Sequence, residues 1–301
     1  MTVAGVEITH PEREVFPEIH LTKLQLAEYY EAVAPLMLPH VKLRPISAVR
    51  CPDGAHGQCF FQKHWPAKGG AKINTKPVAE GDGEPEPYAF AASARDLVAL
   101  VQHGTIETHI WGSKFGSLDK PDRLVLDLDP GPGITWKMIK AAANDVRELF
   151  TSLELESWVK LTGGKGIHVV VPIERRAEWN VVNGFAKAAA ERLTRDNPGL
   201  FVAKASKALR NKRIFIDWLR NSRGATYAAP WCARAREGAP VSVPLHWDEL
   251  SGISKPDQFT IPKVMKMIAK GIDDPWEDML SFKQRLTAAM AEQLLTEGAS
   301  K

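Results

Sequence analysis

The sequence predicts an α+β (mixed α/β) fold. Strand-like and helix-like patterns follow one another along the 301 residues without the strict alternation that a doubly wound parallel sheet requires. The chain is long enough for one large domain or two modest ones. Because no internal repeat, low-complexity tract or clear linker divides it, we expect a single domain over 1–301. In it, an N-terminal portion (about 1–105) packs on a core (about 106–301).

Capping signals predict the N-terminal helices. Thr22 begins a helix, and Gln25 three residues later completes its capping box. Ser93 begins a second helix, which Gly104 is well placed to end. Around these helices we expect a loop over 9–20 and short strands over 45–50 and 58–63. A mobile surface excursion rich in Gly and Pro is expected over 67–87.

Apolar periodicity predicts the remaining elements. Short apolar or alternating runs predict strands at 106–111, 123–129, 157–162, 167–172 and 213–219. Longer amphipathic spacing predicts helices at 135–152, 178–195, 262–271 and 276–295.

Bulk composition sets few limits on function. The net charge of +3 is too small to indicate nucleic-acid binding without local clusters. Three cysteines are an odd and sparse set, which argues against a disulfide framework and fits a reducing cytoplasm. The N-terminus shows no signal peptide, and no apolar run reaches membrane-spanning length, so we expect a soluble intracellular protein with no membrane partner.

Four residues with soft side chains lie close together in the sequence: Cys51, His56, Cys59 and His64. Zinc sites usually show paired spacings such as Cys-x2-Cys, which are missing here. A zinc site therefore stays open as an alternative, and the spacing favours an ordinary loop.

The run RLVLDLDPGPG (123–133) carries two aspartates in an apolar strand. Because strand side chains alternate, Leu126 and Leu128 face the core while Asp127 and Asp129 share the opposite face. Two carboxylates one pleat apart repel each other unless a cation lies between them or water surrounds them. A shared divalent metal ion suits hard oxygen ligands on a rigid element. Two solvated aspartates beside a turn are the alternative.

A third aspartate, Asp217, ends the apolar strand in RIFIDWLRN (213–221). An acid at that place is costly unless it is paired. Three aspartates from two strands can hold two metal ions, the arrangement used for in-line phosphoryl or nucleotidyl transfer. A salt bridge from Asp217 to Arg213 or Arg220 is the alternative.

The segment KLTGGKGIHVVVPI (160–173) places a glycine-rich turn between two strands. Its glycines leave backbone amides for anionic oxygens, and Lys165 adds positive charge. The turn lacks the Walker A pattern, and a strand rather than a helix follows it. His168 faces away from the core and is a candidate donor to a triphosphate. A plain hairpin turn and a structural histidine are the alternatives.

These motifs, in this order, resemble the archaeo-eukaryotic primase superfamily, and within it the polymerase domain of bacterial DNA ligase D. The segments that carry the resemblance are LDLDPG (126–131), TGGKGIHVVVP (162–172) and RIFIDWLRN (213–221), together with FFQKHWP (60–66) and HIWGSK (109–114). The resemblance covers nearly the whole chain. It implies a primase-like catalytic core of two β-sheets flanked by helices, with an N-terminal portion that binds DNA ends.

The resemblance also implies roles for individual residues. Catalytic, metal-binding carboxylates fall on Asp127, Asp129 and Asp217. Nucleotide-binding positions fall on His109, Thr162, Lys165, His168 and Arg234, and Thr162 stands where many relatives have serine. DNA-binding positions fall on Arg13, Lys23, Phe60, Phe61 and Lys63. Further candidates for DNA contact are Arg44, Arg50, Lys68 and the basic run 203–213, for which a solvated loop is an equal alternative.

Two of these positions, Arg13 and Lys23, match basic residues that recognise a 5′-phosphate in relatives. Arg13 is often lysine there, and arginine keeps the charge. Lys23 lies in the first turn of a predicted helix, where its charge opposes the helix dipole, and a bound phosphate would explain it. A solvated side chain is the alternative.

The implied function is a bacterial repair polymerase that adds ribo- or deoxyribonucleotides to a primer 3′-OH at gaps and double-strand break ends in non-homologous end joining. The implied cofactors are two divalent metal ions, manganese favoured over magnesium. The implied partners are DNA ends with a 5′-phosphate, NTP or dNTP, bacterial Ku, and ligase and phosphoesterase domains of the same enzyme if the chain is a fragment. The implied location is the bacterial cytoplasm, at the nucleoid.

Three other functions stay open from the residues alone. A two-metal nuclease or phosphoesterase would use the same aspartates. A DNA-end-binding module would keep the basic and aromatic residues without catalysis. A stand-alone primase would start synthesis without a primer. The sequence has no K-x-D-G motif, so a nucleotidyl-lysine ligase activity is not expected of this chain.

Overall fold

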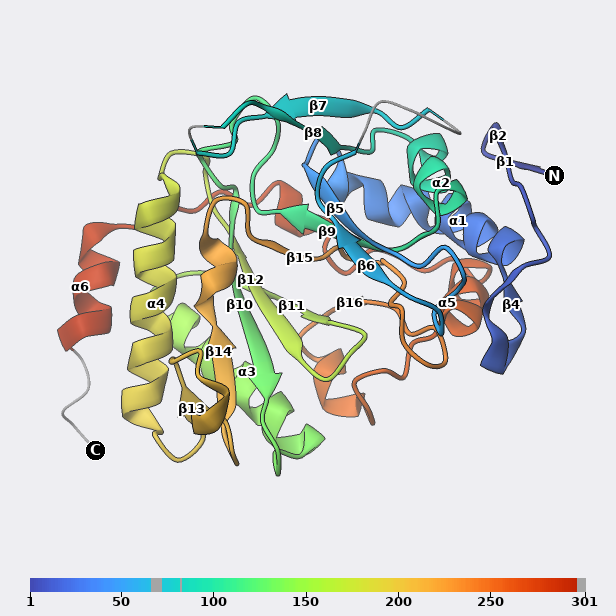
Figure 1. The fold of residues 1–301 in the computed structure, drawn as a ribbon. Coiled ribbons are helices and arrows are strands. Elements are labelled where there is room, and N and C mark those ends of the chain that lie inside the picture. Colours follow the sequence, from blue (N-terminus) through green and yellow to red (C-terminus); the bar gives the residue numbers. More distant parts are fainter. Residues whose placement is uncertain (66–71, 82, 297–301) are drawn as a thin grey trace. The chain divides into compact units, whose positions relative to one another are not determined.

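The computed structural model describes residues 1–65, 72–81 and 83–296 (Figure 1). It confirms the α+β class, with helices and largely antiparallel sheets. The chain forms two compact units. The first unit comprises Met1–Phe115, Thr226–Val243 and Asp257–Asp274, and the second comprises Gly116–Ala225, Pro244–Pro256 and Pro275–Lys301. The expected division near residue 105 therefore falls inside the first unit, and the packing of an N-terminal portion on a core stays a prediction.

The first unit is built on a six-stranded antiparallel sheet in the order β15-β9-β5-β8-β7, with β6 paired to β5. Its strands are β5 (Ile46–Arg50), β6 (Phe60–Gln62), β7 (Thr75–Val78), β8 (Glu86–Ala89), β9 (Thr105–Trp111) and β15 (Thr226–Ala228). Two small hairpins precede it, β1 (Thr2–Val3) with β2 (Val6–Glu7) and β3 (Glu14–Phe16) with β4 (Leu21–Thr22).

The helices of the first unit begin as their capping residues predict. In α1 (Lys23–Val41) the Thr22 hydroxyl accepts from the Gln25 amide and the Gln25 side chain accepts from the Thr22 amide. In α2 (Ala94–Gln102) Ser93 and Asp96 cap reciprocally. The helix α5 (Ile261–Ile268) and the 3-10 turn η1 (Pro17–Ile19) complete the unit, and α1 packs against both α2 and α5.

The second unit is built on a six-stranded sheet in the order β13-β14-β10-β12-β11-β16, antiparallel except for the parallel pair β13 and β14. Its strands are β10 (Arg123–Pro130), β11 (Trp158–Leu161), β12 (Ile167–Pro172), β13 (Phe201–Val202), β14 (Ile214–Asp217) and β16 (Pro244–Leu245). Its helices are α3 (Trp136–Ser152), α4 (Trp179–Asp196) and α6 (Ala288–Thr296), with 3-10 turns η2 (Lys207–Leu209), η3 (Trp218–Asn221), η4 (Glu249–Gly252) and η5 (Asp278–Leu280). Both α3 and α4 pack on the sheet and on each other, and α6 packs on α4.

Apolar alternation fixes the register at the centre of this sheet. Leu126 pairs with Val169, and Leu128 pairs with both Ile167 and Ile216, and all of these side chains are fully buried. A shift by one residue would turn this whole set to the other face. The register is therefore specified by burial, and it decides which polar side chains meet on the opposite face.

Two expected elements differ from the structure. The excursion over 67–87 contains strand β7 and the start of β8, which pair with each other, and Val78 of β7 and Tyr88 of β8 are buried. Residues 66–71 and 82 of that region lie outside the described residues. The helix expected over 276–295 is confined to α6, and a 3-10 turn and irregular backbone precede it.

The expectation against disulfides is wrong for one pair of cysteines. Cys51 and Cys59 are bonded, with Cα atoms 4.3 Å apart. The pairing of β5 with β6 sets Arg50 opposite Phe60, so the two cysteines are the next pair along the hairpin. Hairpin geometry, rather than the number of cysteines, brings them together.

Among the described residues, no helix combines the length and the apolar character needed to cross a bilayer.

Gly131, just after β10, lies so close to the backbone of Arg210 that its substitution is expected to lower the stability of the fold. A Cβ added to Gly131 would lie 1.7 Å from the Arg210 carbonyl oxygen, so Gly131→Ala is expected to lower the free energy of unfolding by about 1–3 kcal/mol. Gly184 in α4 has no atom within 4 Å of an added Cβ, so Gly184→Ala is expected to raise it by about 0.5–1 kcal/mol. Urea titrations of wild type and both variants measure these changes. Equal urea midpoints for Gly131→Ala and wild type would contradict the close approach of Gly131 to the Arg210 carbonyl.

Candidate metal centre and nucleotide-binding residues

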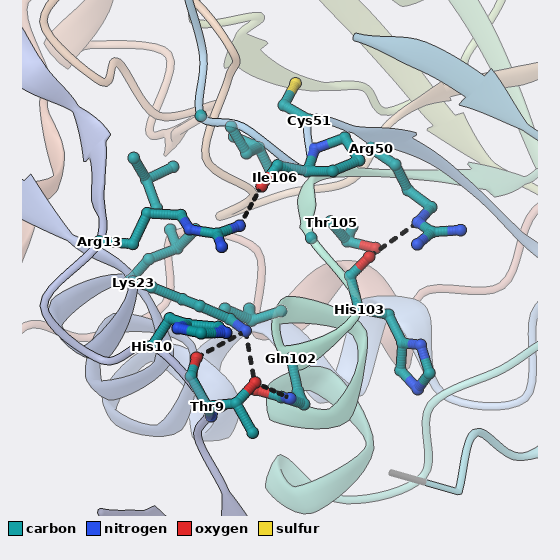
Figure 2. A pocket seen from close by; sticks show the side chains of 16 residues that line it. Thr9, His10, Arg13, Lys23, Arg50, Cys51, Gln102, His103, Thr105 and Ile106 are labelled. Atoms are coloured by element: carbon teal, nitrogen blue, oxygen red, sulfur yellow. Dashed lines mark hydrogen bonds between the residues drawn. The ribbon is translucent and has the colours of Figure 1, made fainter. Parts of the chain in front are cut away.

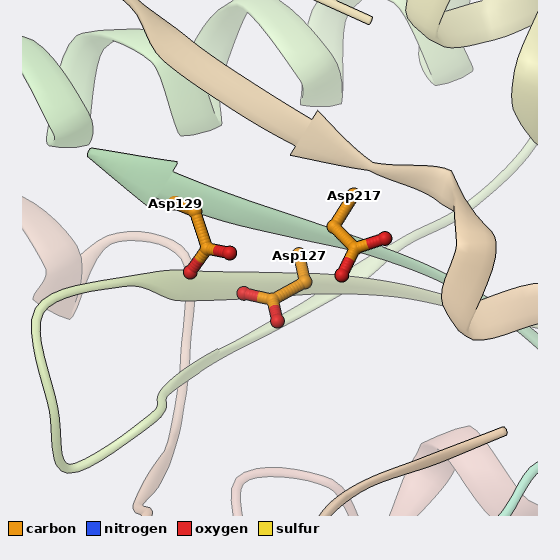
Figure 3. Close-up of side chains that lie close together, drawn as sticks. All are labelled: Asp127, Asp129 and Asp217. Atoms are coloured by element: carbon orange, nitrogen blue, oxygen red, sulfur yellow. The ribbon is translucent and has the colours of Figure 1, made fainter. Parts of the chain in front are cut away.

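Three carboxylates converge on one face of the sheet in the second unit (Figure 3). Asp127 and Asp129 come from β10 and Asp217 from the end of β14. Each offers an oxygen within 4.8 Å of the others. Asp127 lies directly opposite Asp217 in the ladder, and Asp129 follows two residues later on the same face. Among the described residues, this is the only group of three or more His, Cys, Asp or Glu side chains with such spacing.

The cluster continues as a transverse row across four neighbouring strands. Asp217 on β14 lies opposite Asp127 on β10, which lies opposite His168 on β12. His168 in turn lies opposite Lys160 on β11. All four side chains are buried, and Lys160 is fully so. The row therefore runs from two acids through an imidazole to a buried ammonium group.

Arg220 lies against two of the three aspartates. Its Nε is 3.0 Å from Asp217 Oδ2 and 3.4 Å from Asp127 Oδ2. The 3-10 turn that carries it follows β14 directly and is held by Asn221. The Asn221 side chain accepts from the Val125 amide at 2.8 Å and donates to the Val125 carbonyl at 2.7 Å. The salt bridge to Arg220 that the sequence offered as an alternative for Asp217 is thus present beside the carboxylate cluster.

The aspartates differ in how readily they ionise. Burial opposes ionisation of Asp127, but the neighbouring imidazole and the cations Arg220 and Lys160 outweigh it and hold the pKa at about 2. Burial and the Asp127 charge raise the pKa of Asp129 to about 7. Burial, and then repulsion from Asp127, also raise the pKa of Asp217, although Arg220 opposes the rise. The pKa of Asp129 and that of Asp217 thus stay raised although Arg220 and Arg210 lie nearby, and a divalent ion would relieve the repulsion among the three acids.

His168 is held neutral beside this cluster. Its Nε2 lies 3.4 Å from Asp127 Oδ2. Burial, followed by the Lys160 charge, lowers the pKa of His168 to about 4 in spite of the nearby carboxylate. At neutral pH the ring therefore offers one donor and one acceptor nitrogen instead of a positive charge.

The donor set fits a divalent metal ion. Asp127 Oδ1 is buried, and no described residue donates a hydrogen bond to it. A Cβ added to Gly166 would lie 3.5 Å from the same oxygen and 2.6 Å from the Leu128 carbonyl, so only glycine leaves this approach open. Hard oxygen ligands from three carboxylates match the preference of magnesium and manganese. These observations favour a metal ion over two merely solvated aspartates.

The glycine-rich turn between β11 and β12 closes a hairpin and comes just before His168 in the sequence. The Thr162 hydroxyl donates to the Gly166 carbonyl at 3.1 Å and accepts from the Gly164 amide at 3.2 Å. Gly163 has a φ of +67°, which favours glycine. Lys165 is exposed at the tip. The hydroxyl predicted to bind phosphate thus shapes the turn, and the side chain available to a solvent-borne anion is Lys165.

In the first unit, His109 and Arg234 meet at a buried carboxylate, Glu107. Glu107 and His109 share a face of β9, and His109 Nε2 is 2.7 Å from Glu107 Oε2. Arg234 Nε is 3.0 Å from the same oxygen. Burial opposes ionisation of Glu107, but His109, Arg234 and the Ala235 amide hold its pKa at about 2. Two residues predicted to bind nucleotide are therefore brought together.

Arg13 and Lys23 line a cavity of about 290 Å³ in the first unit (Figure 2). Arg13 donates to the Pro52 carbonyl at 2.6 Å. Lys23 is 8% exposed and donates to the Thr9 carbonyl at 3.0 Å and to Gln102 Oε1 at 2.8 Å, which excludes the solvated side chain considered from the sequence. Burial, followed by the Arg13 charge, lowers the pKa of Lys23 to about 8. Two cations that disfavour each other at one cavity are typical of an anion site.

The remaining predicted DNA contacts differ in exposure. Phe60 and Phe61 on β6 are 43% and 52% exposed, which is unusual for phenylalanine. Lys63 forms a salt bridge with Glu80 at 2.9 Å. Arg44 is fully buried and donates to the His40 carbonyl, so its prediction as a DNA contact is wrong. Two further candidates are Arg50, whose Nε donates to the His103 carbonyl, and Lys68, which lies outside the described residues.

The four soft residues considered for zinc do not assemble a site. Cys51 and Cys59 are joined in the disulfide, whereas a zinc ligand is a thiolate. His56 lies 2.7 Å from Glu18 Oε2, and His64 lies 3.6 Å from a carboxylate oxygen of Glu80. Both histidines thus have carboxylate partners elsewhere.

Two residues of these sites, Lys160 and Glu107, were missed from the sequence, and so was the second contact of Arg220, with Asp127. A signal existed for Glu107, because it precedes His109 by two residues on a predicted strand and so shares its face. Lys160 and the Arg220 contact with Asp127 depend on pairing between strands distant in sequence.

A family described as the LigD primase-polymerase domain matches residues 22–276. The chain belongs to this family. A LigD primase-polymerase assignment accounts for the order of the aspartate, glycine-turn and histidine motifs along the sequence, and for the α+β architecture around them.

Curated relatives of this chain are named multifunctional non-homologous end joining proteins LigD. One from Pseudomonas aeruginosa is 42% identical over 299 residues, which cover 97% of this chain and 35% of the relative. One from Mycolicibacterium smegmatis is 30% identical over 248 residues, covering 82% and 32%. The chain thus spans about a third of the length of these relatives.

A solved structure with the same fold is the polymerase domain of Mycobacterium tuberculosis ligase D in complex with DNA. It superposes with a TM-score of 0.85 at 28% identity, covering 92% of this chain and 98% of that one. The likeness confirms the expected architecture over nearly the whole LigD primase-polymerase chain.

Manganese binding at the carboxylate cluster is expected to raise the melting temperature. At a hundredfold excess over its dissociation constant, an ion that binds only the folded state stabilises by about 2.7 kcal/mol. Because protons compete for Asp129, whose pKa is about 7, the affinity should be weaker at pH 6 than at pH 8. Thermal scans with and without manganese at both pH values measure this.

Two variants test where the ion binds. Asp127→Asn is expected to remove most of the manganese-induced shift. Asp145→Asn changes an acid on α3 outside the cluster and is expected to keep it. An undiminished shift in Asp127→Asn would place the ion elsewhere.

Proposed function

We propose that this chain is a DNA repair polymerase that adds ribo- or deoxyribonucleotides to a primer 3′-OH at gaps and broken ends in non-homologous end joining. The observation that carries this proposal is the convergence of Asp127, Asp129 and Asp217 within 4.8 Å on one face of a rigid sheet. Family membership supports it, because the relatives are named for non-homologous end joining.

The three aspartates are proposed to hold two divalent ions, manganese favoured over magnesium as the family resemblance implies. Ions bound there would supply activation of the 3′-hydroxyl and neutralisation of the charge on the leaving pyrophosphate. The chain itself fixes the carboxylates by strand pairing, so they need no rearrangement to face one another. Arg220 adds a positive charge, held by the surrounding aspartates, at the same face.

The proposed triphosphate contacts of the second unit come from the glycine turn and β12. Backbone amides of the turn and the exposed Lys165 suit anionic oxygens. His168 is neutral, so it contributes a directed hydrogen bond instead of a charge. Thr162 keeps the turn in shape. For the first unit we propose that His109 and Arg234 bind nucleotide, on the family resemblance and on their shared anchor at Glu107.

For DNA, we propose that Arg13 and Lys23 bind the 5′-phosphate of the downstream strand and that Phe60, Phe61 and Lys63 contact the DNA at the gap. The cavity that Arg13 and the buried Lys23 line together supports the first role. The two exposed phenylalanines support the second, because bases stack on aromatic rings with little sequence preference, worth about 1–3 kcal/mol each.

Partners beyond DNA and nucleotide are also proposals. Because the relatives are about three times longer, we propose that ligase and phosphoesterase domains act with this one, and that Ku brings it to broken ends in the cytoplasm, at the nucleoid. The support is the name of the relatives and their length.

Primer extension on a gapped duplex with a 5′-phosphate tests the function. Each NTP and dNTP is supplied with manganese, with magnesium or with chelator. Wild type is expected to lengthen the primer only with a divalent ion. Asp217→Ala is expected to lose more than about 100-fold in rate while keeping its circular dichroism, because even outer-sphere changes at metal sites cost 10- to 100-fold.

The control Asp145→Asn is expected to extend at the wild-type rate. Product shortening would favour a nuclease, synthesis without primer would favour a primase, and binding without turnover would favour an end-binding module. Wild-type rates in Asp217→Ala would refute the catalytic assignment.

Phosphate recognition is expected to weaken as pH rises through the pKa of Lys23. That pKa is about 8, so the cationic form is nearly complete at pH 7 and is lost above it. The preference for 5′-phosphorylated over 5′-hydroxyl ends should therefore fall about tenfold from pH 7 to pH 9. Fluorescence anisotropy with both DNAs measures it. Lys23→Arg keeps its charge across this range and is expected to keep its preference. A parallel fall in Lys23→Arg would assign the effect to another group.

A further inference from the structure

Glu107 is a buried carboxylate for which the proposed polymerase chemistry has no direct use. Its side chain is 7% exposed, on the middle of β9. Its two oxygens serve different segments. Oε1 accepts the Ala235 amide at 2.8 Å, and Oε2 faces His109 Nε2 at 2.7 Å and Arg234 Nε at 3.0 Å. One carboxylate thus joins strand β9 to the backbone and side chain of the segment that carries Arg234.

The charge state of Glu107 follows from these contacts. Its pKa is about 2, so the group is ionised throughout the working pH range and only accepts hydrogen bonds. A proton must therefore lie on His109 Nε2, because the ionised carboxylate that faces it can only accept. Arg234 is at the same time held by a charge-assisted contact at 13% side-chain exposure.

We propose that Glu107 is a positioning residue that sets the orientation and protonation of His109 and the orientation of Arg234 together, so that both meet the nucleotide in one arrangement. This inference rests on the proposed nucleotide-binding role of those two residues. Glu107 itself accepts from the Ala235 amide and from His109 and pairs with the Arg234 charge, so it is not expected to touch the nucleotide.

Glu107→Gln is the sharpest change because it keeps the shape. The glutamine oxygen can still accept the Ala235 amide. Its amide nitrogen, a donor, then faces the donor His109 Nε2–H, and Arg234 loses the negative charge with which it pairs. His109 is expected to change tautomer and Arg234 to leave its place, since a buried donor without an acceptor is costly.

The expected effect is a rise of about tenfold in KM for the nucleotide, with kcat and the manganese-induced thermal shift changed less than about twofold, because the carboxylates of the second unit are untouched. Affinity for 5′-phosphorylated DNA should also stay within twofold. Glu107→Asp keeps the charge and withdraws it by one methylene, so its KM should be intermediate. If Glu107→Gln does not fold, Glu107→Asp takes its place in each comparison.

Glu18→Gln is a matched control. Glu18 accepts the Gly238 amide at 2.8 Å and lies 2.7 Å from His56, so it anchors the same loop through a backbone amide and a histidine. Its partners among the described residues are Gly238 and His56, not His109 or Arg234. The KM of Glu18→Gln for the nucleotide is expected to stay at the wild-type value. A tenfold rise in Glu18→Gln as well would reduce Glu107 to an ordinary loop anchor and overturn the proposal.

A mutant cycle decides whether Glu107 acts through its two neighbours. In a His109→Ala/Arg234→Ala background, adding Glu107→Gln should change KM less than twofold, because its partners are already gone. A further tenfold rise would show that Glu107 acts on the nucleotide directly or through the fold, and would overturn the inference. If wild type adds no nucleotide, the proposed function fails. If wild type is active and Glu107→Gln matches it, only this inference fails.

Discussion

The hydrogen-bond register between β10 and β14 is the constraint on which the candidate metal centre depends. It sets Asp127 opposite Asp217, although like charges directly opposite each other destabilise a sheet. On the other face the same register sets Leu128 opposite Ile216, both fully buried. Each such apolar side chain is worth about 1.5–3 kcal/mol when buried. The hydrophobic face therefore enforces an acidic cluster that charge interactions alone would disperse.

The cations around the cluster moderate this repulsion without cancelling it. Lys160 ends the transverse row, and Arg220 reaches both Asp127 and Asp217. Because the guanidinium occupies oxygens that a divalent ion would also use, metal binding and the Arg220 contacts compete for the same carboxylates. A divalent ion prefers sites where several hard oxygens converge, so an ion bound there would weaken the Arg220 contacts. The guanidinium would then lie near any anion that accompanies the ion, which the proposed function takes to be a triphosphate.

The sequence predicts well what is local and poorly what depends on pairing. Strand alternation placed Asp127 and Asp129 on one face, and capping residues placed the starts of α1 and α2, because these signals span only a few residues. The place of Asp217 at the end of an apolar strand suggested it as a third metal ligand, but the register that sets it opposite Asp127 depends on pairing between strands distant in sequence. The disulfide between Cys51 and Cys59 was missed although both flanking strands were expected, since reasoning from the cysteine count took precedence over hairpin geometry. The β7–β8 hairpin was missed because Gly and Pro dominate the composition around it.

Two kinds of buried carboxylate can be told apart by their neighbours. Glu107 is surrounded by donors and cations, its pKa falls to about 2, and its charge is fully used inside the first unit. Asp129 and Asp217 have other acids as neighbours, and burial with that repulsion raises the pKa of each. A carboxylate of the first kind gains nothing from a metal ion, because an ion would have to displace partners already bound. A carboxylate of the second kind is stabilised by a bound ion, because the ion takes the place of a proton or offsets the repulsion from the neighbouring acids. Asp127 shares features of both kinds, because His168 and nearby cations hold its pKa at about 2 while its buried Oδ1 accepts no hydrogen bond from the described residues. An open carboxylate oxygen, more than the pKa alone, therefore separates a metal-binding acid from a positioning one in this chain.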